Sequence, residues 1–252
     1  MSGPTLAASP QTFLLSRTTD LSPAIPTPFR PGQTILEAAR DAGVYVPHLC
    51  CDPELGAHGS CKLCTVTVNG RAASACTMMA ATGQEVEVDT PDLNALRCTL
   101  VQMLFVEGNH FCPGCEKSGN CKLQALGYEF EMTNAHWVHF FPDLGVDATH
   151  PDAWLDRNRC IQCELCVRAS RDIDGKDVFA LGGRGLESKI IVNSPSGKLG
   201  DSDLAITDMA AHICPVGAIL IKRVGFVVPI GERIYDLAPI SAEAASCEIG
   251  ER

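Results

Sequence analysis

The residues best suited to chemistry in this sequence are its 14 cysteines, most of which fall in three groups within 252 residues. The groups lie at 50–76, 112–121 and 160–214. Residues 1–10 have no basic segment followed by an apolar one, so we expect no signal peptide and a cytoplasmic location. Clustered cysteines in a cytoplasmic protein are more typical of metal binding than of disulfide bonds. The sequence therefore predicts thiolate metal centres.

The third group has the most specific spacing. Cys160, Cys163 and Cys166 form C-x2-C-x2-C, which opens the bacterial ferredoxin run C-x2-C-x2-C-x3-C-P. The last cysteine of that run is replaced by Ser170, but a remote cysteine followed by proline is present at Cys214. This spacing predicts one [4Fe–4S] site. Structural zinc is the weaker alternative, because it usually takes two spaced pairs of ligands.

A two-cluster ferredoxin would need three more cysteines before Cys214. Their positions are occupied by Leu204, Thr207 and Ala210. We therefore expect that one of two ancestral cluster sites has been lost and that the third group holds a single cluster.

The first group consists of a C-x2-C pair, Cys61 and Cys64, with one cysteine before it and Cys76 after it. This is the general plan of a plant-type [2Fe–2S] loop, although the first gap differs from the plant spacing. Small residues near the pair allow backbone N–H groups to approach the cluster. Either Cys50 or Cys51 could supply the first ligand.

The middle group, Cys112, Cys115 and Cys121, supplies only three thiolates. A [4Fe–4S] cluster needs a fourth ligand, and His110 stands two residues before the first cysteine. We favour His110, with water or a more distant residue as the alternatives. Imidazole in place of thiolate removes a negative charge and should raise the cluster potential, as in Rieske centres.

Two cysteines lie outside these groups. Cys98 falls within a predicted helix and is expected to be a buried free thiol. Cys247 lies in the C-terminal tail, where we expect no role.

The segments around the first group predict a compact α+β domain. Thr34 followed by Glu37 forms a capping box that starts a helix at 35–42. Alternation at 65–68, followed by Asn-Gly at 69–70, predicts a β-hairpin. Strands are also expected at 11–17 and 85–88.

The remaining chain carries the other two groups. Pro91 is favourable at the first position of a helix that we expect to end at Gly108. A small cysteine-bearing unit follows at 112–128, then a linker at 141–151. The glycine-rich segment 182–185 is too short for a dinucleotide fingerprint and predicts a tight turn.

Composition excludes several function classes. The formal net charge of −10 argues against nucleic-acid binding, which needs a basic face. The longest apolar stretch, 210–221, is too short to cross a bilayer. The sequence has no P-loop, G-x-G-x-x-G motif or recognisable Ser/His/Asp set. We therefore expect no substrate site in this chain.

Five segments resemble a known family: 31–50, 58–64, 107–124, 158–172 and 224–236. The first four are similar to the N-terminal region of the large iron–sulfur subunit of complex I. All five resemble the small diaphorase subunits of soluble bidirectional NAD-reducing [NiFe] hydrogenases, which are the closer match. The resemblance covers nearly the whole chain.

The resemblance implies an α+β fold in four parts. A β-grasp [2Fe–2S] ferredoxin-like domain would span 10–90, and a small helical His/Cys-ligated [4Fe–4S] module 91–140. A bacterial-ferredoxin-like [4Fe–4S] domain would span 150–225, and an extended tail 226–252.

The resemblance also favours Cys50 over Cys51 and implies one [2Fe–2S] and two [4Fe–4S] clusters. Complex I relatives place the ligating histidine of the middle group at the position of Gly108, whereas here the candidate is His110. The implied ligands are Cys50, Cys61, Cys64 and Cys76 for the [2Fe–2S] cluster; His110, Cys112, Cys115 and Cys121 for one [4Fe–4S] cluster; and Cys160, Cys163, Cys166 and Cys214 for the other.

In that family the iron–sulfur protein transfers electrons between an FMN- and NAD-binding flavoprotein and the small and large [NiFe] hydrogenase subunits. FMN, NAD and the Ni–Fe centre are thus expected only in partners, and this chain is expected to be a non-catalytic part of an oxidoreductase. The alternative is an equivalent component of an NAD-linked formate dehydrogenase or a complex I-like assembly. Those relatives continue into further domains, whereas this chain is expected to be the electron-transfer region alone. A zinc-stabilised scaffold would be a function of another class.

Overall fold

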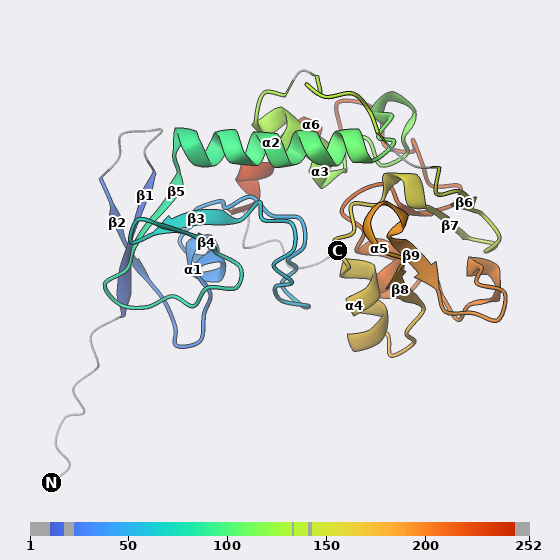
Figure 1. The fold of residues 1–252 in the computed structure, drawn as a ribbon, viewed down its shortest axis with the longest axis horizontal. Helices are drawn as coiled ribbons and strands as arrows, with labels where there is room; N and C mark the ends of the chain where they lie inside the picture. The colour runs from blue at the N-terminus through green and yellow to red at the C-terminus, as the bar shows by residue number, and fades with distance from the viewer. Residues whose placement is uncertain (1–10, 18–22, 133, 141–142, 245–252) are drawn as a thin grey trace, which may run out of the picture. The chain divides into compact units, whose positions relative to one another are not determined.

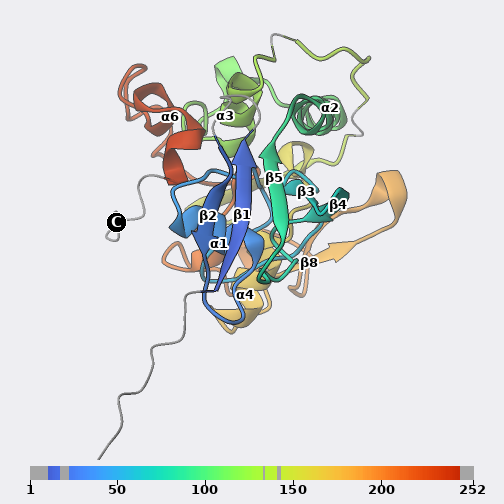
Figure 2. The same ribbon diagram turned by 90° about the vertical axis from the view of Figure 1, so that its left-hand side faces the viewer.

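The computed structural model describes residues 11–17, 23–132, 134–140 and 143–244. The chain divides into two compact units. Unit 1 comprises residues 1–46, 64–94 and 243–252, and unit 2 comprises 47–63 and 95–242. Figures 1 and 2 show the elements of both.

Unit 1 is built on a five-stranded mixed sheet with strand order β2-β1-β5-β3-β4. β1 and β5 run parallel at its centre, and the other neighbours are antiparallel. This is the expected arrangement of a β-grasp sheet with one helix (Figure 2). Its elements are β1 (Thr12–Arg17), β2 (Ile25–Pro28), α1 (Ile35–Asp41), β3 (Thr65–Val68), β4 (Arg71–Ser74) and β5 (Glu85–Asp89).

Local sequence signals account for most of unit 1. The capping box at α1 is present: Glu37 N donates to Thr34 Oγ1 at 3.2 Å, and Thr34 N donates to Glu37 Oε2 at 2.7 Å. Asn69 and Gly70 both have positive φ, 49° and 76°, as the two-residue hairpin between β3 and β4 requires. The predicted helix and hairpin are confirmed.

Unit 2 combines short helices with two small sheets. α2 begins in unit 1 and continues through unit 2, with Arg97 and Val101 on its buried face. β10, β7 and β6 form one sheet, and β8 and β9 form the other. The elements are α2 (Pro91–Glu107), η1 (Cys112–Gly114), α3 (Lys122–Glu129), β6 (Val146–Asp147), β7 (Ala153–Asp156), η2 (Arg157–Arg159), α4 (Leu165–Asp172), β8 (Phe179–Gly182), η3 (Gly185–Glu187), β9 (Lys189–Val192), η4 (Leu199–Asp201), α5 (Met209–His212), β10 (Ile219–Ile221), α6 (Ile234–Leu237) and η5 (Ile240–Ala244).

Two expectations about irregular segments were wrong in part. The predicted linker at 141–151 contains β6, because Val146 and Asp147 pair with β7. The linker's first two residues lie outside the described part of the chain. The predicted extended tail contains α6 and η5, and its last residues, 245–252, also lie outside that part.

The glycine-rich segment lies in the hairpin connection between β8 and β9. This connection covers residues 183–188 and includes η3, so it is longer than the predicted tight turn. Gly183 has a φ of +84°. A Cβ on Gly183 would overlap the carbonyl of Glu187, so a side chain has no room there. Among the described residues, no helix has the length and apolarity needed to span a membrane.

Candidate iron–sulfur centres

The third cysteine group is gathered around the start of α4. Cys163, Cys166 and Cys214 are buried, and Cys160 is half-buried. Gln162 N donates to Cys160 Sγ at 3.4 Å, from a residue with a positive φ of 53°. All four cysteines line one small buried cavity between β7, α4 and β10.

The thiols of this group have raised pKa values. Burial raises the pKa of Cys160 to about 12, and it also raises the pKa values of Cys163 and Cys166. Nearby thiols, including Cys214, act in the same direction. Buried thiols of this kind are neutral until a metal displaces their protons. The donor set therefore suits an iron–sulfur cluster, whose thiolate ligands share their charge with iron.

Three of the four positions at which a second cluster site would have cysteines lie in the core. The Ser170 side chain is fully buried, and its Oγ accepts a hydrogen bond from Val178 N at 2.7 Å. Leu204 and Ala210 are also buried, whereas Thr207 is exposed. Ser170, Leu204 and Ala210 therefore contribute to packing in this region.

The middle group lies between the end of α2 and α3. Burial raises the pKa of Cys112, and it raises that of Cys121 to about 12. Negative charge on Cys112 or Cys115 would raise the pKa of Cys121 further. Cys115 N donates to Cys112 O at 3.2 Å, which closes the 3-10 turn that contains the C-x2-C pair.

His110 has the features of a metal ligand. Its Nε2 is buried and has no hydrogen-bond partner. Burial, together with the charge of Arg159, lowers the pKa of His110 to about 4, and the carbonyl of Leu104 acts in the opposite direction. The ring is therefore neutral near pH 7, as a histidine that binds a metal must be.

Gly108 leaves room for the side chain of His110. A Cβ on Gly108 would overlap His110 Nε2 and lie 2.8 Å from its Cδ2. The imidazole of His110 therefore occupies the space beside residue 108. Phe105 supports the ring edge-on, with 5.4 Å between the ring centroids.

The first cysteine group appears as two sulfur pairs, one in each unit. In unit 2, Cys50 Sγ lies 3.4 Å from Cys61 Sγ. In unit 1, Cys64 Sγ lies 3.2 Å from Cys76 Sγ. The hydrogen bond between these two sulfurs raises the pKa of Cys61 and lowers that of Cys50. Close sulfur pairs on a continuous C-x2-C loop suit thiolate ligation.

Within unit 2, the third group adjoins both of the others. Cys50 packs in one buried cluster with Cys163 and Leu165. On the other side, a Cβ on Gly217 would lie 2.8 Å from Cys115 Sγ, so the backbone after Cys214 passes directly beside the middle group.

Arg159 also joins the third and middle groups, and sequence reasoning did not identify it. Its Nη1 donates to Cys115 Sγ at 3.5 Å and lies 3.2 Å from Glu116. Its Nε lies 2.9 Å from Asp156 Oδ2, and its guanidinium stacks over Trp154 at 5.2 Å. In the sequence, the feature that could have identified Arg159 was its position next to Cys160.

Three cysteines lie outside the candidate ligand sets. Cys51 is half-buried, whereas its neighbour Cys50 is buried. Cys98 is half-buried rather than buried, and its sulfur accepts a hydrogen bond from Gln102 at 3.4 Å. Cys247 lies outside the described residues. Across the described ranges, no three His, Cys, Asp or Glu side chains converge on a single metal ion.

Three regions match families of iron–sulfur domains. Residues 25–91 match a 2Fe-2S iron-sulfur cluster binding domain. Residues 97–136 match the NADH-ubiquinone oxidoreductase-G iron-sulfur binding region, and residues 154–221 match a 4Fe-4S single cluster domain. With the α+β fold and the buried cysteine groups, these matches define the protein as an iron–sulfur electron-transfer protein with one 2Fe-2S region and 4Fe-4S regions.

Individual relatives show to which family of iron–sulfur proteins the chain belongs. The chain is 42% identical over 218 residues to the gamma subunit of the NAD-reducing hydrogenase HoxS of Cupriavidus necator, covering 86% of this chain and 92% of that protein. It therefore belongs to the family of the gamma subunits of NAD-reducing hydrogenases. A crystal structure of NAD+-reducing [NiFe]-hydrogenase in the H2-reduced state contains a chain with a TM-score of 0.86 and 52% identity, covering 93% of this chain and 98% of that one.

More distant relatives belong to complex I. The mitochondrial NADH-ubiquinone oxidoreductase 78 kDa subunit of Candida albicans is 29% identical over 206 residues, which cover 77% of this chain but 27% of that protein. The chain thus matches about a quarter of that longer protein.

Proposed function

We propose that this chain relays electrons through three iron–sulfur clusters between a [NiFe] hydrogenase module and an FMN/NAD-binding flavoprotein, in the cytoplasm. The observation that carries the proposal is the set of three cysteine groups, the third of which adjoins the other two. When bound, the clusters supply one-electron transfer over potentials of roughly −700 to +450 mV. The chain itself would be non-catalytic, and its four-part division at 10–90, 91–140, 150–225 and 226–252 is part of the proposal.

The residues that would hold the clusters are those predicted from the sequence. Cys50 has its sulfur 3.4 Å from that of Cys61, which supports Cys50 as the first ligand. The unpartnered Nε2 supports His110 as the fourth ligand of the middle cluster. The ligand sets are Cys50, Cys61, Cys64 and Cys76 for the [2Fe–2S] cluster, and His110, Cys112, Cys115 and Cys121, and Cys160, Cys163, Cys166 and Cys214, for the two [4Fe–4S] clusters.

The order of the relay follows from the contacts within unit 2. Cys50 packs against Cys163, and Arg159 reaches from the third group to Cys115. These contacts support an order in which the third group stands between the [2Fe–2S] site and the middle group. The two ends of the relay would then exchange electrons with different partner subunits.

A partner surface adjoins the middle group. We call the exposed apolar side chains of residues 224–230 the tail strip: Val224, Phe226, Val227, Val228 and Ile230. Together with Cys112 and Tyr128, the strip lines a groove of about 530 Å³. Exposed apolar patches of this kind mark lasting protein interfaces.

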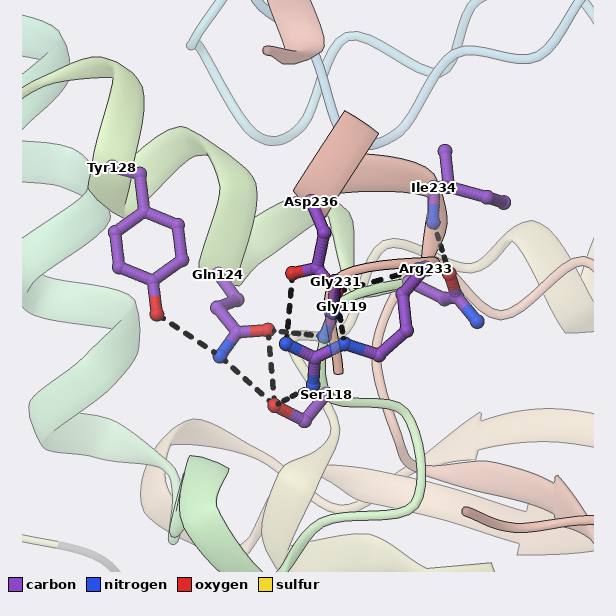
Figure 3. Close-up of polar contacts among 9 residues, drawn as sticks. Ser118, Gly119, Gln124, Tyr128, Gly231, Arg233, Ile234 and Asp236 are labelled. Carbon is purple, nitrogen blue, oxygen red and sulfur yellow. Dashed lines mark hydrogen bonds and ion pairs between the residues drawn. The ribbon is translucent and has the colours of Figure 1, made fainter. Parts of the chain in front are cut away.

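The tail strip is held in place by its neighbours (Figure 3). Arg233 Nη1 donates to Ser118 Oγ at 3.3 Å, and its Nε pairs with Asp236 at 2.6 Å. Ile234 N donates to Asn120 Oδ1 at 2.9 Å. These bonds attach the tail to the loop between Cys115 and Cys121. A docked partner would therefore lie beside the middle cluster.

Purification of the tagged chain from its native source tests the function. We expect nickel and FMN in the complex, because the hydrogenase and the flavoprotein would copurify. The substitution Ile230→Asp should release one of these two modules and retain the other, since a buried unpaired charge opposes docking. Val138→Asp, at an exposed site outside the strip, should release neither.

Two results would contradict the proposal. Flavin without nickel would favour the formate dehydrogenase or complex I-like alternative, which the comparisons do not favour. If the Ile230→Asp variant retained both modules, the tail strip would not be part of the interface.

A further inference from the structure

Arg168 lies on α4, two residues after Cys166, and its side chain reaches back to the loop of the first cysteine group. The residue is only 8% exposed. Its Nη2 donates to Cys50 O at 2.9 Å, and its Nη1 donates to Leu55 O at 3.2 Å and to Gly56 O at 3.3 Å. One buried guanidinium therefore connects the helix of the third group to the loop that carries Cys50.

Among the described residues, no carboxylate forms an ion pair with Arg168. Its three acceptors are neutral carbonyls, and its Nε is buried with no hydrogen-bond partner. The charge of Asp172 acts on Arg168 from a greater distance, but Asp172 pairs directly with Arg171 at 2.6 Å. A buried cation without a close counter-charge is strongly unfavourable. A negatively charged group beside Arg168 would remove this cost.

Thiolate-ligated clusters carry that negative charge. Arg168 follows Cys166 on the same helix and holds the carbonyl of Cys50, so it lies beside ligands of two proposed clusters. Cys50 and Cys163 pack together in the same buried region. Each added electron makes such a site more negative, and a nearby cation stabilises the reduced form.

We propose that Arg168 is the shared counter-charge of the [2Fe–2S] cluster and of the [4Fe–4S] cluster of the third group, and that it sets both reduction potentials. It is a positioning residue as well, because its hydrogen bonds fix the loop that carries Cys50. The inference rests on the proposed cluster sites.

Arg159, in the same unit, differs from Arg168 because its charge is balanced by carboxylates. It approaches Cys115, but Asp156 and Glu116 balance its charge. Removing Arg168 should therefore act on the two clusters beside it and leave the middle cluster nearly unchanged. A general loosening of the fold would not give this selectivity.

The test is a redox titration of the purified complex, followed by EPR, for Arg168→Gln, Arg168→Lys and Arg171→Gln. In Arg168→Gln the reduction equilibria of the [2Fe–2S] cluster and one [4Fe–4S] cluster should shift roughly tenfold toward the oxidised form, which is about 59 mV for one electron. Arg168→Lys keeps the charge and should restore most of both potentials. Arg171 lies on the same helix with an exposed side chain, and Arg171→Gln should change neither.

Several outcomes would overturn the inference. One is unchanged potentials in Arg168→Gln with all clusters present, which would leave the proposed function standing. Another is an equal shift in Arg171→Gln. If Arg168→Gln loses a cluster, Arg168→Lys decides the matter: a tenfold shift despite the retained charge would show that hydrogen bonding, not charge, is the cause. Absence of clusters from the wild-type chain would instead contradict the proposed function.

Discussion

Replacement of Cys163 with serine is expected to abolish H2-driven NAD+ reduction by the complex. Cys163 is buried, belongs to the central cysteine group and packs against Cys50. Residues that merely support a metal ligand cost about 10- to 100-fold in affinity or activity, so loss of a ligand itself should cost at least roughly 100-fold. The measurement is NADH formation under H2 by the purified complex.

Two controls separate a broken relay from a damaged complex. Reduction of an artificial acceptor by H2, and by NADH, should each survive in Cys163→Ser, because both ends of the proposed pathway would lie in partner subunits. Cys98→Ser alters a half-buried thiol outside the cluster groups and should leave H2-driven NAD+ reduction unchanged. Full H2-driven NAD+ reduction by Cys163→Ser would show that the third cysteine group is not on the electron path.

Replacement of His110 should alter a single cluster. In His110→Ala the middle [4Fe–4S] cluster should lose its EPR signal or shift its reduction equilibrium by at least roughly tenfold, about 59 mV. The [2Fe–2S] signal and the other [4Fe–4S] signal should persist. The reason is the unpartnered Nε2 of His110, which is buried and neutral beside an incomplete thiolate set.

The variant His110→Cys tests the direction in which the charge of the ligand shifts the reduction potential of the middle cluster. A thiolate in place of imidazole adds negative charge, so the potential of the middle cluster should fall below that of the wild type. His136 is exposed, and His136→Ala should have no effect. If all three signals keep their potentials in His110→Ala and in His110→Cys, the fourth ligand is another group.

The sequence predicted those parts of the fold whose causes are local. The capping box of Thr34 and Glu37 and the Asn69-Gly70 hairpin involve residues that are close in sequence, and both are present. The three cysteine groups were also recognisable, because cluster ligation requires particular spacings. These signals need no knowledge of distant contacts.

Tertiary contacts account for what was missed. Arg168 acts on a carbonyl 118 residues away, and Arg159 on a sulfur 44 residues away. In the sequence, each is one arginine beside a cysteine motif. Val146 and Asp147 were predicted to be part of a linker, because a strand of two residues is too short to show the alternation of apolar and polar residues. The strand is defined only by its pairing with β7.

The position of His110 shows how sequence and structure combine. The missing fourth thiolate raised the possibility of a histidine ligand, while the spacing differed from that of complex I relatives. Gly108 has no Cβ and leaves room for the ring of His110, which supports the proposal that His110 is the ligand.

The central claim is that this chain holds one [2Fe–2S] and two [4Fe–4S] clusters, and the most direct test is chemical analysis of the full chain purified without oxygen. We predict about ten iron and about ten acid-labile sulfide per chain, with three separate EPR signals on reduction. Zinc without sulfide would identify a structural scaffold and contradict the account. About six iron with two signals would show that one of the three sites does not hold a cluster.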